Sequence, residues 1–581
     1  MVSTLRGIAA TSGVAIGSCL LYDPMPPVIP EHRIAPDTVA TEKERLQRAI
    51  AASMQEVSEL HDQVQERLGE ETAAIFNAHL LMLEDEELLT GANQRIEQEL
   101  MNAERAFWES AEEFIHIIAE LTDTYFRARA ADMHDIRVRV VCHLQGRPSA
   151  QLRYMNKPAI IVARDLLPSD TAGLDPALVL GLVTEQGGPT SHTAILARQL
   201  GIPAVVGVSG LMAAFEAMGK LPERLAIDGG MGTVKIDPDA ETVARYEDAL
   251  QSYRQHQQEL QFFRSRPAVT LDGVKVEIAA NIGKPQEARP AVEAGADGVG
   301  LFRTEFLFLN RATPPDEEEQ LASYRTVLEE FAGKTVIIRT LDIGGDKSIP
   351  YLALAPESNP FLGLRGIRLC LAEAHQPLFR TQLRALLRAA ESQVASLWIM
   401  LPMISDIREV RQTKALIADT EADLLAEGKI RNPVRQHLRL GIMIETPAAA
   451  LLVDVLAKEV EFFSIGTNDL VQYTLASDRM NANLANLHSP FHPAVMRSLA
   501  NIITTAREHE RWVGMCGEMA GDPRATAFLV GLGINELSMD PSSFNAVKQV
   551  VCGLTASQAK ARIEQVLRAE SAEAVEALLT P

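Results

Sequence analysis

Apolar residues change their spacing along this chain, and each spacing is typical of a different architecture. Residues 14–22 form a strand-like run that a proline-rich stretch interrupts at once. Residues 38–145 place apolar residues three and four apart, as in LLMLEDEELL and FWESAEEFIHIIAEL. From residue 158 strands and helices alternate, as in PAIIVAR, LVLGLVTE and RLAIDGGMGTVKIDP. The pattern predicts an α/β unit with an inserted helical bundle.

A polar helix at 240–264, rich in Gln, Glu and Arg, predicts a solvent-exposed connector to the rest of the chain. Short apolar runs then recur with helical stretches between them. The eight runs are VEIAAN, GVGLFR, TVIIRTLD, LWIMLPM, LRLGIMIE, EFFSIGTND, WVGMCGE and NELSMD. Eight β/α repeats predict a closed parallel (β/α)₈ barrel, or TIM barrel, whose chemistry belongs at the carboxyl ends of its strands.

We therefore expect an α/β multidomain protein. The predicted domains are an α/β domain at 1–23 and 148–240, a helical insert at 24–147, a helical linker at 241–268 and a (β/α)₈ barrel at 269–581. A chain of 581 residues that is 47% hydrophobic can bury more than one such core.

The charge balance excludes two kinds of partner. Lys and Arg number 55 against 77 Asp and Glu, a net charge of −22, so the surface repels nucleic acid and anionic lipid. No uncharged apolar run reaches the roughly 18 residues of a membrane-spanning helix, so we expect no membrane insertion. The 5 cysteines lie far apart without a CxxC pair, which predicts a reducing compartment and a cytoplasmic location.

Much of the acidic excess lies in the helical insert, where residues 41–100 hold 14 acidic and 5 basic residues. Two interpretations stay open for this stretch: an ordinary solvated helix face, or a docking surface for a basic partner. The same choice applies to His79 and Met82, which belong either to the bundle core or to an exposed groove.

The first candidate for chemistry is the segment GGPTSHTAILARQL. Its glycine pair permits a tight turn and Ser191 can cap a helix, so His192 should lie at a helix amino terminus. Free amide donors and the helix dipole would stabilise a phosphate there, and a neutral imidazole is a nucleophile that can carry it. The alternative is a histidine that only fills the helix start.

The second candidate lies at the predicted barrel mouth. Four arginines belong to its motifs: Arg303 in FRTEF, Arg339 in IIRTLDIGGDK, Arg365 in LGLRGIR and Arg479 in ASDR. Their planar guanidiniums match phosphate and carboxylate oxygens, which predicts a small polyanionic ligand. Glu445 and Asp469 follow adjacent strands and are hard oxygen ligands suited to Mg²⁺. Ion pairing between these acids and arginines is the alternative.

Cys516 follows the seventh predicted barrel strand. Its thiol could give a proton to an enolate carbon. A buried strand cysteine without chemistry is an equally ordinary interpretation.

These motifs together resemble enzyme I of the phosphoenolpyruvate-dependent sugar phosphotransferase system, a phosphoenolpyruvate-protein phosphotransferase. The matching motifs are GG-x-T-S-H, LFRTEFLF, RTLDIGGDK, NPFLGLRGIR, ETPAAA, FFSIGTNDLVQYTLASDR and MCGEMAGD. They occur in the order and spacing of that family and cover essentially the whole chain. The resemblance implies a phosphohistidine α/β domain that swivels, an insert that binds the phosphocarrier HPr, and a barrel that binds phosphoenolpyruvate.

The resemblance also implies roles for individual residues. His192 would be the phosphorylated histidine, supported by Thr171, and Cys516 would donate the proton that converts enolpyruvate into pyruvate. Substrate binding is implied for Arg303, Arg339, Arg365, Asn468 and Arg479, and Mg²⁺ binding for Glu445 and Asp469. HPr docking is implied for His79, Leu81, Met82, Glu87 and Leu88, with Arg129 nearby. Pro189 stands where many relatives have a basic residue, which removes one phosphate contact.

The activity implied by the resemblance is a two-step relay. Phosphoenolpyruvate would phosphorylate His192 and leave pyruvate, and the phosphoryl group would pass to a histidine of HPr, the first step of sugar uptake. The α/β domain would swing between the barrel mouth and the insert. A homodimer through the barrel is implied by the resemblance alone.

Three other functions are alternatives to this phosphoryl relay. A nitrogen-regulatory enzyme I paralogue usually has a sensory domain ahead of the first strand, whereas this sequence starts with the phosphohistidine unit. A phosphoenolpyruvate synthase or dikinase needs a nucleotide-binding domain, and no GxxxxGK[ST] loop is present. A phosphorylation sensor without turnover would not need the complete set of Arg, Glu, Asp and Cys residues at the mouth.

Overall fold

The computed structural model describes residues 3–579, except for 12, 23–28, 31, 69, 120–123, 147–151, 153–154, 167–169, 171–173, 189–190, 310, 312, 346–348, 353, 356, 480, 482–483 and 485–486. The chain divides into two compact units, Met1–His256 and Gln257–Pro581. No helix within the described ranges has both the length and the apolar character needed to cross a bilayer.

The first unit contains an eight-stranded sheet in the order β1-β8-β7-β3-β4-β5-β6-β2. The strands are β1 (Ser3–Arg6), β2 (Ile8–Thr11), β3 (Val14–Tyr22), β4 (Ala159–Ala163), β5 (Val179–Thr184), β6 (Ala204–Val206), β7 (Arg224–Asp228) and β8 (Thr233–Ile236). Strands β3 to β6 pair in parallel and the remaining pairs are antiparallel. Two apolar clusters, one around Ile161 and one around Ile227, contain side chains from its strands and from helices.

Among the described residues, α7 (His192–Leu200) and α8 (Leu211–Met218) contribute to these clusters. Helix α9 (Ala240–Gln261) follows β8 and extends past the end of the first unit. The predicted strand at 14–22 is confirmed as β3. The sequence interpretation missed β1 and β2, because two strands of four residues separated by Gly7 leave too few positions to establish a periodicity.

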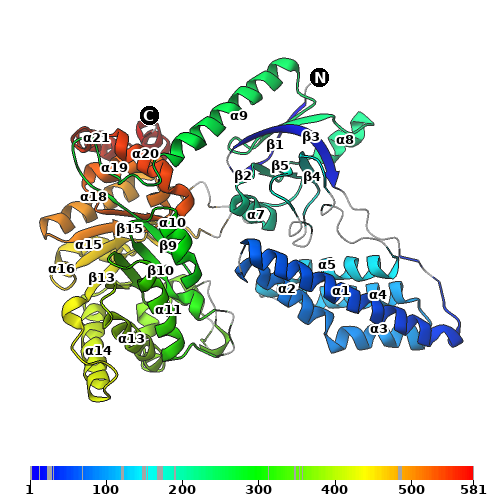
Figure 1. The fold of residues 1–581 in the computed structure, drawn as a ribbon, viewed down its shortest axis with the longest axis horizontal. Helices are drawn as coiled ribbons and strands as arrows, with labels where there is room; N and C mark the ends of the chain where they lie inside the picture. The colour runs from blue at the N-terminus through cyan, green and yellow to red at the C-terminus, as the bar shows by residue number, and fades with distance from the viewer. Residues whose placement is uncertain are drawn as a thin grey trace. The chain divides into compact units, whose positions relative to one another are not determined.

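Between β3 and β4 the chain forms a helical bundle, as predicted. Its helices are α1 (Val39–Leu68), α2 (Glu70–Leu83), α3 (Glu86–Gln98), α4 (Ala103–Ala119) and α5 (Thr124–Leu144). They run side by side (Figure 1) around a core that includes Val57, Phe76, Phe107 and Ile136. Asp85 begins α3 by accepting a hydrogen bond of 2.9 Å from the backbone N–H of Leu88, which satisfies one of the free amides of the first turn.

The second unit is a closed barrel of eight parallel strands in sequential order, with β16 pairing back to β9. The strands are β9 (Glu277–Ile282), β10 (Val299–Arg303), β11 (Thr335–Arg339), β12 (Ser396–Leu401), β13 (Arg439–Ile444), β14 (Phe462–Ile465), β15 (Trp512–Met515) and β16 (Glu536–Met539). Each coincides with one of the eight predicted runs, although β9 ends one residue after its run and β12 begins one residue before its own. The predicted fold class, with its TIM barrel, is confirmed.

Helices surround the barrel strands (Figure 1). They are α10 (Ala288–Glu293), α11 (Glu317–Glu330), α12 (Ile367–Leu371), α13 (Gln376–Ala390), α14 (Ile407–Ala426), α15 (Pro447–Leu451), α16 (Val453–Leu456), α17 (Thr467–Leu475), α18 (Pro493–Glu508), α19 (Pro523–Leu532), α20 (Phe544–Gly553), α21 (Ala556–Arg568) and α22 (Ala572–Leu579). An apolar layer that includes Phe302, Ile338 and Leu386 joins strands to helices. This layer supplies most of the buried apolar surface that stabilises the barrel.

Aromatic side chains fill the barrel interior near the amino ends of its strands. The Trp398 ring packs at a tilt against Phe462 and edge-on against Trp512, with ring centroids 4.8 and 5.0 Å apart. All three side chains belong to the first half of a strand. The amino end of the barrel is therefore a packed core, which leaves the carboxyl end for polar residues.

Candidate active site

Two arginines end neighbouring strands at the carboxyl end of the barrel. Arg303 ends β10 and Arg339 ends β11, and the two residues are partners in the parallel register. Arg339 is buried, with its Nη2 at 2.7 Å from Glu305 Oε1 and its Nη1 at 3.2 Å from Asp342 Oδ2. The two carboxylates compensate the charge of a guanidinium that burial would otherwise make costly.

Both of these guanidiniums keep an unused donor. The Nε atoms of Arg303 and Arg339 are buried and have no hydrogen-bond partner within the described residues. The Arg303 guanidinium also lies 5.1 Å from the centroid of the Phe306 ring, which supports it from one side. A buried N–H left without an acceptor costs about 1–3 kcal/mol, so the pair provides binding energy for an anion that enters the mouth.

Arg365 is held differently, because each of its five N–H donors has an acceptor. Nε and Nη2 bond the two oxygens of Asp342, both at 3.2 Å. Nη1 and Nη2 bond the two oxygens of Asp469 at 2.9 and 3.0 Å, and Nη1 also bonds the Tyr473 hydroxyl at 3.1 Å. Arg365 therefore follows the ion-pair alternative: it orients two carboxylates, and no N–H remains for a direct substrate contact in this arrangement.

The loop after β14 brings Asn468 and Asp469 to the mouth in the first turn of α17. The Asn468 side chain donates to Glu518 Oε1 at 3.2 Å and accepts from the Glu518 backbone N–H at 3.0 Å. Arg479 is half-buried, with its Nη1 at 3.9 Å from Asp469 Oδ1 and its guanidinium 5.9 Å from the Phe361 ring centroid. Asn468 is thus placed by Glu518, whereas Arg479 is placed by Asp469 and Phe361.

Glu445 follows β13 and is buried with one oxygen, Oε1, accepting a hydrogen bond of 2.6 Å from the backbone N–H of Met403. Met403 has a φ of 61°, which a non-glycine residue seldom adopts, so the backbone is strained where it meets this carboxylate. Burial, with Asp469 and Asp342 nearby, raises the pKa of Glu445 to about 8. Three carboxylates therefore interact here in a buried site.

These carboxylates fit a divalent cation. The raised pKa of Glu445 means that its ionised form lacks sufficient compensating positive charge, and Glu445 and Asp469 offer the hard oxygen ligands that Mg²⁺ prefers. Within the described residues no three His, Cys, Asp or Glu side chains form a complete metal-binding group. Two protein carboxylates, with water and substrate oxygens as the remaining ligands, match the way Mg²⁺ is usually held beside a phosphate.

Cys516 lies directly after β15, buried inside the barrel. Its sulfur accepts a hydrogen bond from the Ser464 hydroxyl at 3.3 Å and donates to the Ile465 carbonyl at 3.8 Å. Burial raises the pKa of the Cys516 thiol to about 12. The group is therefore protonated at neutral pH, which is the state that a proton donor requires.

His192 lies where the sequence predicts, at the first position of α7. Ser191 is the N-cap and accepts a hydrogen bond of 3.3 Å from the Ala194 backbone N–H. Gly187 has a φ of 99°, a conformation that a glycine adopts without strain. The imidazole of His192, and all of Thr171 and Pro189, lie outside the described residues.

The predicted docking residues on the bundle differ in how far their side chains are buried. Leu81 is 70% exposed and Glu87 is exposed, and Met82 is half-buried. His79 and Leu88 are buried: His79 packs edge-on against Phe76 with its Nε2 3.6 Å from Asp132 Oδ1. Within this set Leu81 and Glu87 can meet a partner directly, whereas His79 supports the helix that carries Leu81. The Arg129 side chain lies outside the described residues.

Sequence reasoning missed several residues of the mouth. Glu305, Tyr473 and Ser464 lie in the motifs FRTEF, NDLVQYT and FFSIGTND, yet only the neighbouring cations and acids were selected. A signal existed for Glu305, since a carboxylate two residues after a strand-end arginine also reaches the mouth. No comparable signal marks Ser464, because a serine inside a strand is common.

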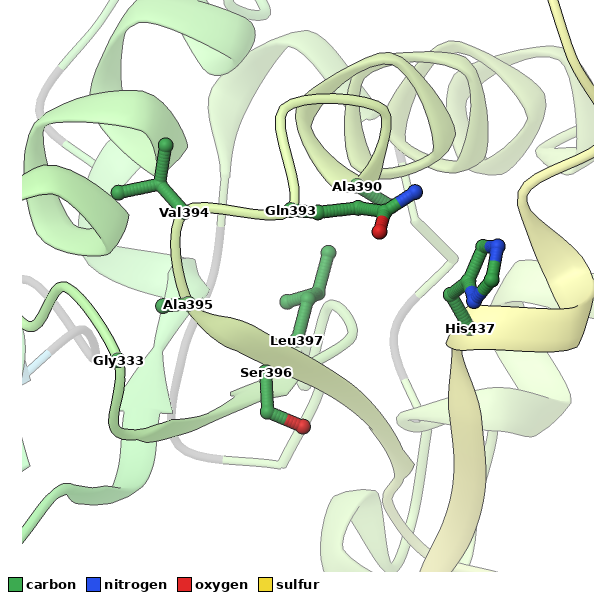
Figure 2. Close-up of a pocket in the computed structure, with 8 residues that line it drawn as sticks. All are labelled: Gly333, Ala390, Gln393, Val394, Ala395, Ser396, Leu397 and His437. Carbon is green, nitrogen blue, oxygen red and sulfur yellow. The ribbon is translucent and has the colours of Figure 1, made fainter.

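A cavity of about 230 Å³ lies at the other end of the barrel (Figure 2). Its lining residues are Gly333, Ala390, Gln393, Val394, Ala395, Ser396, Leu397 and His437. Ser396 begins β12, and Figure 2 shows the Gln393 side chain extending toward the His437 ring. The cavity holds none of the predicted site residues and is separated from them by the length of the barrel strands.

Comparison with known proteins places this architecture in one class. Residues 257–555 match the family described as PEP-utilising enzyme, PEP-binding domain. Residues 6–129 match PEP-utilising enzyme, N-terminal, and residues 155–232 match PEP-utilising enzyme, mobile domain. The chain is thus built from the three parts of a phosphoenolpyruvate-utilising enzyme.

Full-length relatives narrow the class to one family. A phosphoenolpyruvate-protein phosphotransferase of Geobacillus stearothermophilus is 45% identical over 98% of this chain and 97% of its own length. One from Bacillus subtilis is 42% identical over 99% of both chains. A solution structure of an enzyme I protein is 35% identical, with a TM-score of 0.39, and covers 43% of this chain and 99% of that chain. The chain belongs to the phosphoenolpyruvate-protein phosphotransferase family.

Proposed function

We propose that this protein transfers the phosphoryl group of phosphoenolpyruvate to its own His192 and then to a histidine of the phosphocarrier HPr, the first step of sugar uptake by the phosphotransferase system. The observation that carries the proposal is the adjacent pair of Arg303, which is half-buried, and Arg339, which is buried. Within the described residues each has a buried Nε–H without a hydrogen-bond partner. A doubly charged phosphate beside a carboxylate is the kind of anion that satisfies such donors.

Within this proposal Arg303, Arg339, Asn468 and Arg479 bind the substrate phosphate. Arg365 contributes by holding Asp342 and Asp469, since all five of its N–H donors already have acceptors. Glu445 and Asp469 would hold Mg²⁺, which when bound neutralises negative charge on the phosphate. The side chains of the mouth exclude water and fix the phosphate orientation that transfer requires.

The phosphoryl step breaks the bond between phosphorus and the enol oxygen and forms a bond between phosphorus and an imidazole nitrogen of His192. The amino terminus of α7 stabilises the dianion that results, and Thr171 supports it. The enolate left behind takes a proton from the Cys516 thiol at its methylene carbon and becomes pyruvate. The histidine phosphate then serves as donor to HPr.

The proposal includes the organisation predicted from the sequence. The phosphohistidine domain comprises 1–23 and 148–240, the HPr-binding insert 24–147, the linker 241–268 and the barrel 269–581. The phosphohistidine domain must swing between donor and acceptor, and the enzyme acts in the cytoplasm as a homodimer through its barrel.

The proposed reaction is tested by mixing the protein with phosphoenolpyruvate labelled in its phosphate, Mg²⁺ and HPr. We expect acid-labile label first on His192 and then on HPr, with one pyruvate formed per phosphate transferred. Label from ATP on His192 would instead favour a dikinase. Preferred phosphoryl transfer to a nitrogen-regulatory carrier over HPr would identify the protein instead as the nitrogen-regulatory paralogue of enzyme I.

Glu445→Gln should lower the affinity for Mg²⁺ at least about tenfold, because it removes one of two anionic ligands. Calorimetric titration with Mg²⁺ measures this without turnover. Glu536→Gln is the matched control, since Glu536 is equally buried but begins β16 near the amino end of the barrel. Equal Mg²⁺ affinity in both variants would show that Glu445 does not bind the cation.

Leu81→Glu should slow phosphoryl transfer to HPr about tenfold, because it places a charge in an exposed apolar contact of the docking surface. Phosphorylation of His192 by phosphoenolpyruvate should not change. Leu271→Glu, at a residue 71% exposed on the other unit, is the control. An unaltered rate of transfer to HPr in Leu81→Glu would exclude this face of α2 from docking.

A further inference from the structure

The sulfur of Cys516 is held by two residues of the neighbouring strand β14. Ser464 lies on β14, which pairs in parallel with β15, and its side chain is fully buried. Its hydroxyl donates to the Cys516 sulfur over 3.3 Å, and the thiol donates in turn to the Ile465 carbonyl over 3.8 Å. The sulfur is therefore both an acceptor and a donor, which restricts rotation of the thiol.

The backbone of Cys516 is fixed by separate contacts. Its N–H donates to the Ile465 carbonyl at 3.1 Å, and its own carbonyl accepts from Asn281 Nδ2 at 3.1 Å. The Ser538 hydroxyl donates to Asn281 Oδ1 at 2.7 Å, so it bonds the Asn281 amide and not the sulfur. The Ser464 hydroxyl thus acts on the sulfur itself, while the position of the Cα atom depends on other groups.

We infer that Ser464 is a positioning residue for proton donation by Cys516: its hydroxyl orients the thiol and stabilises the negative charge that develops on sulfur. The inference rests on the proposed function. In the step, the S–H bond breaks and a C–H bond forms at the methylene carbon of enolpyruvate, while the enolate electron pair forms the C=O bond. The thiolate is then reprotonated from water.

Three charged groups on other strands also influence the sulfur. Glu445 and Glu536 disfavour charge on it, and the Arg339 guanidinium favours it. Burial opposes charge most strongly, and the Ser464 hydrogen bond is the largest contribution in the opposite direction. A neutral hydroxyl in contact with sulfur thus helps the proton to leave without adding charge to the buried site.

Ser464→Ala tests the inference because it removes a single atom from the sulfur's surroundings. We expect pyruvate formation to fall about tenfold, the usual effect of losing one hydrogen bond to a charged atom, with an unchanged KM for phosphoenolpyruvate. Label transfer to His192 in a single turnover should stay near the wild-type rate. Ser464→Cys keeps a weaker donor of similar size, so its rate of pyruvate formation should lie between those of the wild type and Ser464→Ala. It replaces the Ala variant if that variant does not fold.

Alkylation of Cys516 by iodoacetamide at pH 9 separates this role from simple packing. Loss of the hydrogen bond lowers the thiolate fraction, so alkylation in Ser464→Ala should slow about tenfold. A merely loosened barrel would expose the thiol and speed alkylation. Ser538→Ala removes the same atom from an equally buried barrel serine, and its alkylation rate should stay within about twofold of wild type.

The outcomes distinguish this inference from the proposed function. If Cys516→Ala forms pyruvate at the wild-type rate, the proposed role of Cys516 is wrong. If Cys516→Ala is inactive but Ser464→Ala forms pyruvate at the wild-type rate, the inference about Ser464 is overturned. Faster alkylation in Ser464→Ala, or an equal loss of phosphohistidine and pyruvate formation, would also overturn it.

Discussion

His192→Ala will reduce incorporation of phosphate from phosphoenolpyruvate by about 10⁴-fold or more, because removal of a nucleophile leaves no group to form the covalent intermediate. The free amides at the start of α7 cannot replace an imidazole nitrogen, although they remain in place. Phosphate labelling, followed by mass spectrometry of protein quenched at alkaline pH, measures the loss. Pyruvate formation and phosphorylation of HPr should disappear together.

A second histidine variant controls for nonspecific effects. His437→Ala alters the cavity at the amino end of the barrel and should keep the wild-type level of labelling. Two results would contradict the proposed reaction: turnover in His192→Ala, or wild-type turnover with His192 unmodified. In either case phosphoryl transfer would have to proceed without a residue of α7.

Arg365→Met will lower the free energy of unfolding by about 3–5 kcal/mol and abolish turnover. The substitution removes the guanidinium that bonds both oxygens of Asp342 and of Asp469. Asp342 keeps its ion pair with Arg339 and Asp469 keeps the more distant Arg479, and a poorly compensated buried charge is costly. It also releases Asp469 from its position beside Glu445, where the cation would bind. Denaturant unfolding of the full-length protein, followed through the barrel tryptophans, measures the first effect.

The matched control for Arg365→Met is Arg380→Met on α13. Arg380 forms one ion pair, with Asp423 at 3.0 Å, and both side chains are substantially exposed. Water solvates such a pair in either state, so the cost should stay below about 1 kcal/mol. Similar costs for the two variants would mean that the network around Arg365 contributes little to the stability of the barrel.

Local patterns predicted many of the elements that place the site. The apolar run at 14–22 became β3, and the caps and glycines around Ser191 predicted that His192 begins α7. Each barrel strand coincides to within one residue with a predicted apolar run, because a strand covered on both faces needs apolar side chains on both. The end of each apolar run also marks the end of a strand, so the side chains that follow the strand were predictable as well.

Other features depended on partners distant in the sequence. Arg365 was expected to contact substrate, yet its donors are used by residues 23 and 104 positions away. His79 and Leu81 are two residues apart on one helix, and burial of the first against exposure of the second follows from how α2 packs in the bundle. The strands β1 and β2 were too short to be found without the sheet that pairs them.

Spacing and the properties of single residues were enough to predict the order of domains, the periodic elements and the chemical types at the strand ends. The use of each donor was visible only in the folded chain. Within the described residues Arg303 and Arg339 each keep an Nε–H without an acceptor, all five donors of Arg365 have one, and Ser464 donates to the sulfur of Cys516. The physical reason is that a hydrogen bond depends on distances of about 3 Å between atoms, and closure of the barrel sets those distances.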